Sequence, residues 1–255
     1  MEKSSRKVAI VTGAASGIGK AVAQRFLRRG WALALGARDT SRVSEFLQSE
    51  GEDIQVMTGF LDLEQESSIE PFVNSALEKF GRVDTMINCA GLALGRETAD
   101  QGDLDEWRKM VQTDYFGPMA LTRKLLPEMK RQNSGHIINI GALAALFPHP
   151  GSAVYASAKE GIRMFLQCLR EDTLGTGIRV TNIDPGITRT QFAHVRFRGD
   201  NEAVNKMLEG LTPLEPEDVA ECVWFAASMP DHVNIGQITV TPTDQVSPVR
   251  VFKRQ

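Results

Sequence analysis

The chain has 255 residues, of which 42% are hydrophobic and 24% charged, and its net charge is −3. This balance is typical of a globular protein and argues against a disordered chain or a broad nucleic-acid-binding surface. Cys89, Cys168 and Cys222 are scattered without a CxxC pair, so we expect neither a disulfide framework nor a metal site. The polar start and the lack of a long apolar stretch predict a cytoplasmic protein that does not span a membrane.

Short apolar runs alternate with amphipathic segments along the chain, and they predict strands and helices in turn. In chain order the predicted elements are a strand at 8–11, a helix at 18–29, a strand at 32–37, a helix at 41–48, a strand at 54–60, a helix at 64–80, a strand at 85–88, a long helix at 105–131, a strand at 136–140, a helix at 155–174, a strand at 179–183, a helix at 217–228 and a strand at 235–240. Apolar strands separated by helices indicate a parallel sheet covered on both faces. We therefore predict an α/β fold over residues 1–255, a single Rossmann-type doubly wound sheet.

One long segment, residues 186–213, interrupts this alternation. It carries several charges and follows the carboxyl end of a predicted strand, where open α/β sheets bind their ligands. We interpret it as a substrate lid, and a plain surface insertion is the alternative.

A glycine-rich turn, TGAASGIG, follows the first predicted strand. Glycines permit a tight turn and a close approach of the backbone to a pyrophosphate, and the free N–H groups of the following helix face that phosphate. An ordinary structural turn is the alternative. The residues that we expect at a nucleotide are Gly13, Ser16, Gly17, Ile18 and Gly19.

Four motifs in this order resemble the short-chain dehydrogenase/reductase superfamily: TGAASGIG, NCAG at 88–91, YASAK at 155–159 and Pro-Gly at 185–186. Longer strings, NCAGLALG, GHIINIG, HVRFRGD and HVNI, resemble its NADP-dependent 3-hydroxy acid (serine-type) dehydrogenases. The resemblance implies an oxidoreductase that transfers a hydride between NAD(P) and a small alcohol or carbonyl compound, including 3-hydroxy acids. It also implies a homodimer or homotetramer, with no nucleic-acid or membrane partner.

The resemblance aligns Ala37 with the acidic residue that selects NAD, and Arg38 follows it. A guanidinium can pair with a 2′-phosphate, so we expect NADP (NADPH) as the cofactor. A solvated surface arginine is the alternative. The resemblance implies further cofactor contacts around the adenine, the ribose and the nicotinamide, at Asp62, Leu63, Asn88, Ala90, Gly91, Pro185, Gly186, Ile187, Thr188 and Thr190.

Tyr155 and Lys159 are four residues apart, which places both on one face of a helix. A nearby ammonium is expected to lower the pKa of Tyr155, so that the tyrosine can donate or accept a proton near neutral pH. Lys159 is also expected to hold the nicotinamide ribose. An amphipathic helix with a buried ring and a solvated lysine is the alternative.

Two residues depart from the family pattern in this constellation. Ala142 stands where the resemblance places a serine that binds the substrate carbonyl, and Asp114 stands where it places an asparagine. Two hypotheses follow: an NADP-dependent oxidoreductase that lacks one catalytic hydroxyl, and a catalytically weak or inactive nucleotide-binding protein of the same fold.

Arg196 and Arg198 lie in the segment interpreted as a lid, within the string VRFRG. An arginine fork matches a carboxylate with two hydrogen bonds, and the resemblance to 3-hydroxy acid dehydrogenases suggests such a substrate. We therefore predict that Arg196 or Arg198 binds a substrate carboxylate; a solvated loop charge is the alternative.

Overall fold

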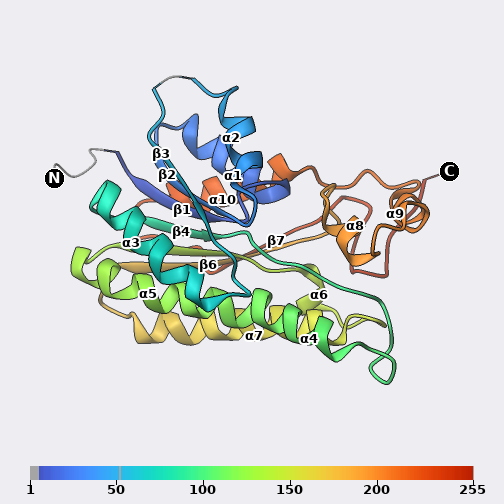
Figure 1. The fold of residues 1–255 in the computed structure, drawn as a ribbon. Coiled ribbons are helices and arrows are strands. Elements are labelled where there is room, and N and C mark those ends of the chain that lie inside the picture. The colour runs from blue at the N-terminus through green and yellow to red at the C-terminus, as the bar shows by residue number, and fades with distance from the viewer. Residues whose placement is uncertain (1–5, 52, 255) are drawn as a thin grey trace.

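The computed structural model describes residues 6–51 and 53–254, and a parallel sheet of seven strands runs through this part of the chain (Figure 1). The strand order is β3-β2-β1-β4-β5-β6-β7. The strands are β1 (Val8–Thr12), β2 (Ala32–Ala37), β3 (Val56–Phe60), β4 (Thr85–Asn88), β5 (Gly135–Ile140), β6 (Ile178–Pro185) and β7 (Gln237–Val240). The prediction of a doubly wound parallel sheet is confirmed.

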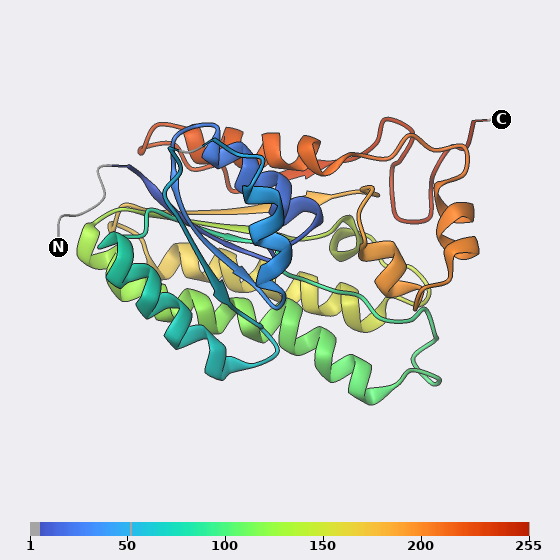
Figure 2. The ribbon, with the colours of Figure 1, turned by 45° about the horizontal axis from the view of Figure 1, so that its top comes forward.

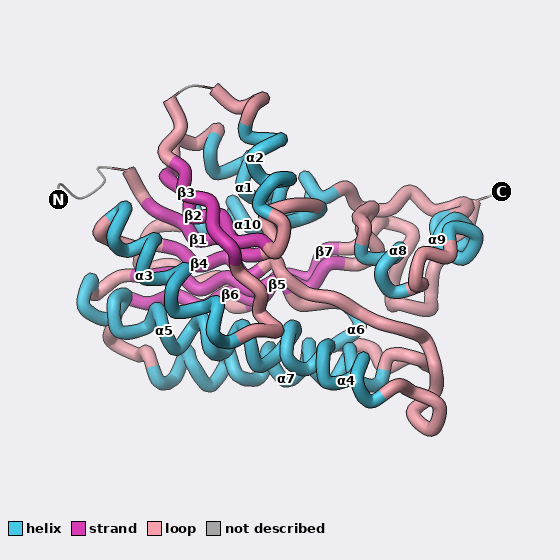
Figure 3. Tube along the Cα trace, in the orientation of Figure 1, coloured by secondary structure: helices cyan, strands magenta, loops and turns pink. Residues whose placement is uncertain are grey.

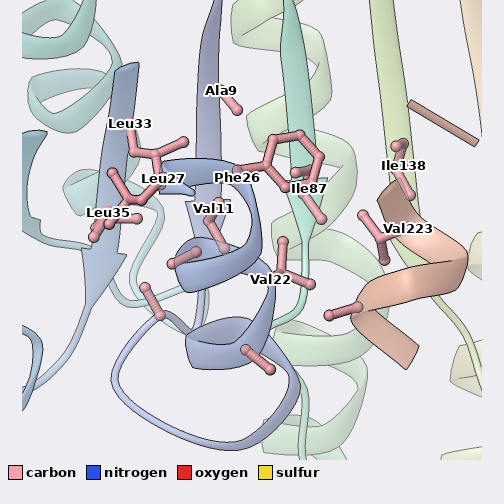
Figure 4. Packing of buried hydrophobic residues seen from close by; sticks show 14 of the residues in the cluster. Ala9, Val11, Val22, Phe26, Leu27, Leu33, Leu35, Ile87, Ile138 and Val223 are labelled. Carbon is pink, nitrogen blue, oxygen red and sulfur yellow. The ribbon is translucent and has the colours of Figure 1, made fainter. Parts of the chain in front are cut away.

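Helices cover both faces of the sheet, as Figure 2 shows from a second side. One face carries α1 (Gly17–Leu27), α2 (Thr40–Leu47) and α10 (Pro216–Ser228); the other carries α3 (Ile69–Phe80), α5 (Gly117–Gln132) and α7 (Ala153–Asp172). In Figure 4, Phe26 of α1 and Val223 of α10 lie over Ile87 and Ile138 of the sheet. Each face thus buries a continuous layer of apolar side chains, which is the main driving force for this architecture.

The region predicted as a long helix at 105–131 is helical throughout, but it is not one regular α-helix, because a π-helical turn divides it. Its elements are α4 (Leu104–Val111), the π-helical turn η2 (Gln112–Phe116) and α5. Pro118 has no N–H to donate to the carbonyl of residue 114, so the regular α-helical bonding is interrupted there. Gly117 lets this turn approach the loop after β3 closely, because a Cβ atom at this position would lie 2.5 Å from the Leu63 carbonyl oxygen.

Residues 186–213 are ordered and contain two short helices, α8 (Phe192–Arg196) and α9 (Asn201–Leu208). They lie beyond the carboxyl ends of the strands, together with α4 and α6 (Leu143–Leu146), a short helix that the sequence did not indicate (Figure 3). The chain returns to this segment near its end, where the Arg254 N–H donates to the Gly210 carbonyl at 2.7 Å.

In the described part of the chain, no helix has both the length and the apolar character needed to cross a membrane. The remaining helix is the single 3₁₀ turn η1 (Glu66–Ser68), at the start of the region predicted as a helix at 64–80.

A chain of buried polar side chains crosses the sheet near the carboxyl ends of its strands. Thr12, Asn88, Asn139 and Asn182 occupy the same register level on β1, β4, β5 and β6. Each donates to the next: the Thr12 hydroxyl to Asn88 at 2.9 Å, Asn88 to Asn139 at 2.8 Å, and Asn139 to Asn182 at 2.9 Å. Asn182 donates in turn to Asp184 Oδ1 at 2.8 Å. This polar chain therefore ends on a buried carboxylate, and each side chain in it provides a hydrogen-bond partner for the next.

We predict that Asn139→Ala destabilises the fold, because it leaves the Asn88 amide and the Asn182 carbonyl without their partners inside the sheet. Each orphaned group costs about 1–3 kcal/mol. Urea unfolding measures the change. The control is Asn74→Ala on the exposed side of α3, which should change the unfolding free energy by less than about 0.5 kcal/mol. Equal stabilities of the two variants would contradict the role given to the polar chain.

Candidate active site

The glycine turn between β1 and α1 packs directly against the end of β4. Gly13 has φ = +65°, and a Cβ atom there would lie 3.0 Å from the backbone of Ala90. A Cβ atom on Gly19 would lie 2.3 Å from the Gly13 carbonyl oxygen. The turn therefore needs glycine at both positions, and it brings three of the predicted cofactor residues together.

A cleft of about 580 Å³ opens between this turn and the start of the lid segment. Ser16 and Gly17 form one wall, and Thr188 and Thr190 form the other. Ser16 is the N-cap residue of α1, and its hydroxyl makes no capping bond, so the first N–H groups of the helix are left for a ligand. These features fit the pyrophosphate of a dinucleotide.

Two cations line the same cleft, Lys20 and Arg42. The sequence analysis did not single out Lys20, although it follows Ser16 by one helical turn, and that spacing was an available signal. Its ammonium lies 5.5 Å from the ring centroid of Phe46. Both cations add positive charge where phosphate groups are predicted.

Arg38 is exposed at the end of β2, and its guanidinium has no hydrogen bond or ion pair within residues 6–51 and 53–254. The neighbouring Asp39 carboxylate is engaged elsewhere, because it caps α2 and accepts bonds from the Ser41 N–H and hydroxyl. The bond from the Ser41 hydroxyl is the main cause that lowers the pKa of Asp39. Arg38 is therefore free to meet a phosphate.

The predicted adenine-side residues form a turn after β3. Asp62 Oδ1 accepts the Glu64 N–H at 3.0 Å, while Leu63 is buried against Gly117. Just before Thr188, Gly186 donates to the Val240 carbonyl at 2.8 Å and Ile187 donates to Gln245 Oε1 at 2.8 Å. Gln245 is 58 residues downstream of Ile187, and no sequence pattern pointed to it.

Tyr155 and Lys159 lie on α7, as predicted, with both side chains buried. The Tyr155 ring packs against Phe192 of α8 with centroids 5.5 Å apart. Its hydroxyl has no hydrogen-bond partner among the residues that the structure describes, so it is available to a ligand. Lys159 Nζ donates to the Ile140 carbonyl at 3.1 Å and lies 3.1 Å from Asp114 Oδ1.

The expected lowering of the Tyr155 pKa is wrong. Burial raises the pKa of Tyr155, and the carboxylates of Asp114 and Asp184 raise it further. Among the charges around the ring it is Arg196, not Lys159, that lowers this pKa. The Lys159 ammonium instead faces Asp114 Oδ1 at 3.1 Å.

Ala142 is the N-cap residue of α6, and its methyl group joins an apolar cluster with Ala93, Met110 and Tyr155. The Ala142 N–H donates to Asp184 Oδ1 at 3.0 Å, which connects this position to the end of the polar chain. The Ser152 hydroxyl donates to the His149 carbonyl at 2.6 Å and so does not replace the missing hydroxyl.

The two arginines of the lid have different surroundings. Arg198 is held by two carboxylates, with Nη1 2.6 Å from Glu97 Oε1 and Nη2 2.7 Å from Glu106 Oε2. Arg196 lies beside Tyr155, its guanidinium carbon 5.9 Å from the ring centroid, and its Nη2 donates to the Gly151 carbonyl at 3.1 Å. Its Nε is buried without a hydrogen-bond partner in the described chain. Arg196 is thus the arginine with a free donor at Tyr155.

The described residues contain no group of three or more His, Cys, Asp or Glu side chains placed to hold a metal ion. Around Tyr155 the site is therefore built from one phenol, the Lys159–Asp114 pair and Arg196, with apolar walls. Such a site can exchange a proton with a small bound molecule and attract an anionic group on it.

Comparisons with known proteins point the same way. Residues 7–201 match the family model described as short chain dehydrogenase. The chain is 38% identical over 239 residues to sulfoacetaldehyde reductase 2 of Chromohalobacter salexigens, covering 93% of this chain and 95% of that protein. It is 39% identical over 239 residues to an NADP-dependent 3-hydroxy acid dehydrogenase of Salmonella typhimurium, covering 93% and 96%.

A solved structure of similar fold is the closed form of serine dehydrogenase complexed with NADP+, with a TM-score of 0.90 and 36% identity. The match covers 97% of this chain and 100% of that one. The family model spans most of the sequence, and the relatives match over nearly their whole length. The chain therefore belongs to the short-chain dehydrogenase family, as its motifs predicted.

Proposed function

We propose that this protein is an NADP(H)-dependent oxidoreductase that transfers a hydride between the nicotinamide and the carbonyl carbon of a small substrate. The observation that carries the proposal is the Tyr155 hydroxyl, which belongs to a buried side chain, has no hydrogen-bond partner in the described chain and lies one helical turn from Lys159. Lys159 lies against Gly91, next to Ala90, and Ala90 is the residue on which Gly13 of the glycine turn packs. Bound NADPH supplies the hydride, and Tyr155 supplies the proton that the carbonyl oxygen takes up.

Three features support NADP(H) as the cofactor. Ala37 offers no carboxylate to the adenosine ribose, Arg38 is exposed and unpaired in the described chain, and Lys20 and Arg42 add positive charge at the cleft. The relative from Salmonella typhimurium is named as NADP-dependent, and the serine dehydrogenase structure holds NADP+. The remaining predicted cofactor contacts belong to this proposal as well.

The substrate that fits is a short aldehyde or ketone with an acid group. The pocket beside Tyr155 is lined by Ala93, Trp107 and Met110, and Arg196 is a cation at its wall. The names of the relatives describe 3-hydroxy acids and sulfoacetaldehyde, and both compounds carry an acid group. Arg196 is the better candidate to bind it, because Arg198 already has two carboxylate partners.

We also propose that the chain assembles as a homodimer or homotetramer. Val111, Phe116 and Met164 are 41%, 42% and 50% exposed on α4, η2 and α7. Exposed large apolar side chains on neighbouring helices are what a subunit interface would cover.

We predict that NADPH binds about ten- to a hundredfold more tightly than NADH, because Arg38 can form a charge-assisted contact with the 2′-phosphate. Arg38→Ala should remove most of this preference, whereas Arg123→Ala, an exposed arginine on α5, should retain it. Fluorescence titration with both cofactors provides the affinities. Equal affinities in the wild-type protein would refute the assignment of Arg38.

We predict that Arg196→Met lowers kcat/KM for a short aldehyde carboxylate by about ten- to a hundredfold relative to an uncharged aldehyde of the same length. The ratio of the two substrates isolates anion binding, because any effect on Tyr155 acts on both. Arg198→Met is the matched control and should leave the ratio unchanged. If neither arginine variant changes this ratio, the lid does not bind the acid group.

We predict that the protein retains weak hydride transfer and that Ala142→Ser raises it. The lost hydroxyl would donate to the carbonyl oxygen where negative charge develops, and removing one such donor costs about 10²–10³ in rate. The serine should therefore raise the rate of hydride transfer by about 10¹–10². The additional change Tyr155→Phe should abolish the gain. A protein that binds NADPH but turns over no carbonyl compound in any of these forms would favour the alternative, a nucleotide-binding protein without catalysis.

A further inference from the structure

The Lys159 ammonium is paired with a buried carboxyl group. Its side chain is 5% exposed and that of Asp114 is 0% exposed, and their charged atoms are 3.1 Å apart. A second bond from Lys159 Nζ goes to the Ile140 carbonyl. Burial raises the pKa of Asp114, and the charge of Lys159 opposes that rise. When both groups are ionised they form a buried dipole, in which Lys159 is not an isolated cation.

Asp114 is held in place from a second direction. Its Oδ1 accepts the Leu92 N–H at 3.1 Å, and the π-helical turn η2 points the side chain at the loop after β4. A Cβ atom on Gly91 would lie 2.6 Å from Asp114 Oδ1 and 2.9 Å from Lys159 Nζ, so the backbone closes over the pair. An asparagine could accept the same N–H but would bring no charge, and that is the residue the family resemblance places here.

The charged groups around Tyr155 come from several elements. Its own helix contributes Lys159, η2 contributes Asp114, β6 contributes Asp184 and α8 contributes Arg196. Glu97 and Glu106, which are both bound to Arg198, line the same pocket. His149, in the turn before α7, is close enough to Arg196 that the charge of Arg196 lowers its pKa, although burial is the larger cause. Burial, Asp114 and Asp184 all raise the pKa of Tyr155, and Arg196 opposes them. An acid group bound to Arg196 would offset the positive charge that lowers the pKa of Tyr155.

We propose that Asp114 offsets the charge of Lys159 and so keeps Tyr155 in its proton-donating form, which makes this site a carbonyl reductase at neutral pH and a poor alcohol dehydrogenase. This inference rests on the proposed oxidoreductase function. Asp114 acts here as a positioning residue, since it touches Lys159 and not the substrate.

The direction follows from the proton balance of the reaction. In reduction, the carbonyl carbon gains a hydride from NADPH, the π electrons of the C=O bond move to oxygen, and that oxygen takes the proton of the Tyr155 hydroxyl. The product is the alcohol with NADP+, and the tyrosinate regains its proton from water. Oxidation needs the tyrosinate at the outset, so its rate falls about tenfold for each pH unit below the pKa of Tyr155.

The test uses the fact that the chain has two tyrosines, Tyr115 and Tyr155. With tyrosine labelled by ¹³C at Cζ, NMR resolves each phenol as it ionises, and Tyr115→Phe assigns the signals. The NMR titration needs neither cofactor nor substrate. A failure of this inference can therefore be distinguished from a wrong substrate class or a lack of turnover.

We predict that wild-type Tyr155 stays protonated at a pH where free N-acetyltyrosinamide is already half ionised. Asp114→Asn should shift its titration to lower pH by about one unit or more, because a like charge is removed and Lys159 is released. Arg196→Met should shift it to higher pH. Asp172→Asn, at the exposed end of the same helix, is the control for a general charge effect and should leave the titration in place.

The pH dependence of the reduction and oxidation rates gives an independent test. Between about pH 7 and pH 10, wild-type reduction should stay level while oxidation of the product alcohol rises about tenfold per unit. In Asp114→Asn this rise should reach its plateau at lower pH. The proposal is overturned if Tyr155 ionises below the free phenol in the wild-type protein. It is equally overturned if Asp114→Asn leaves the titration unchanged.

Discussion

The polar chain from Thr12 to Asp184 constrains everything at the functional edge of this sheet. Four strands place polar side chains at one register level, where a parallel sheet covered on both faces has no water to satisfy them. They must therefore bond to one another, and they do so in a single direction. Thr12 Oγ1 also accepts the N–H groups of Cys89 and Ala90, so the chain begins at the cofactor turn. At its other end, Asp184 holds the N–H of Ala142.

This constraint fixes the position of the turn after β4, beside the predicted nucleotide site, relative to the start of α6, beside Tyr155. The turn after β4 cannot move without breaking the bonds to Thr12, and α6 begins where Asp184 holds it. Between these two points lie Gly91 and the Asp114–Lys159 pair, closed over by backbone. Tyr155 stands at the rim, where the lid residues Phe192 and Arg196 meet it. Lys159 is therefore paired with Asp114, and the cation that packs over the Tyr155 ring is Arg196 of the lid.

The sequence predicted those parts of the fold that depend on local pattern. Apolar strands, the glycine turn and the Tyr155–Lys159 spacing are encoded within a few residues, and the strands at 32–37 and 85–88 have the predicted bounds. The features that it did not predict depend on contacts between distant segments. Examples are the close packing of Gly117 on Leu63 and the bond that Gln245 accepts from the Ile187 N–H. The rise in the Tyr155 pKa comes mainly from burial, which no spacing reveals, and then from Asp114, 41 residues upstream.

The central claim is that this site moves a hydride onto a carbonyl carbon while Tyr155 provides the proton. Transfer of deuterium from NADPH labelled at the nicotinamide C4 tests it most directly, with excess protein, a short aldehyde carboxylate and mass analysis of the product. The account predicts that deuterium appears on the carbinol carbon in the wild-type protein, faster in Ala142→Ser, and not at a measurable rate when Tyr155 is replaced by Phe. Deuterium transfer that is unaffected by Tyr155→Phe would contradict it.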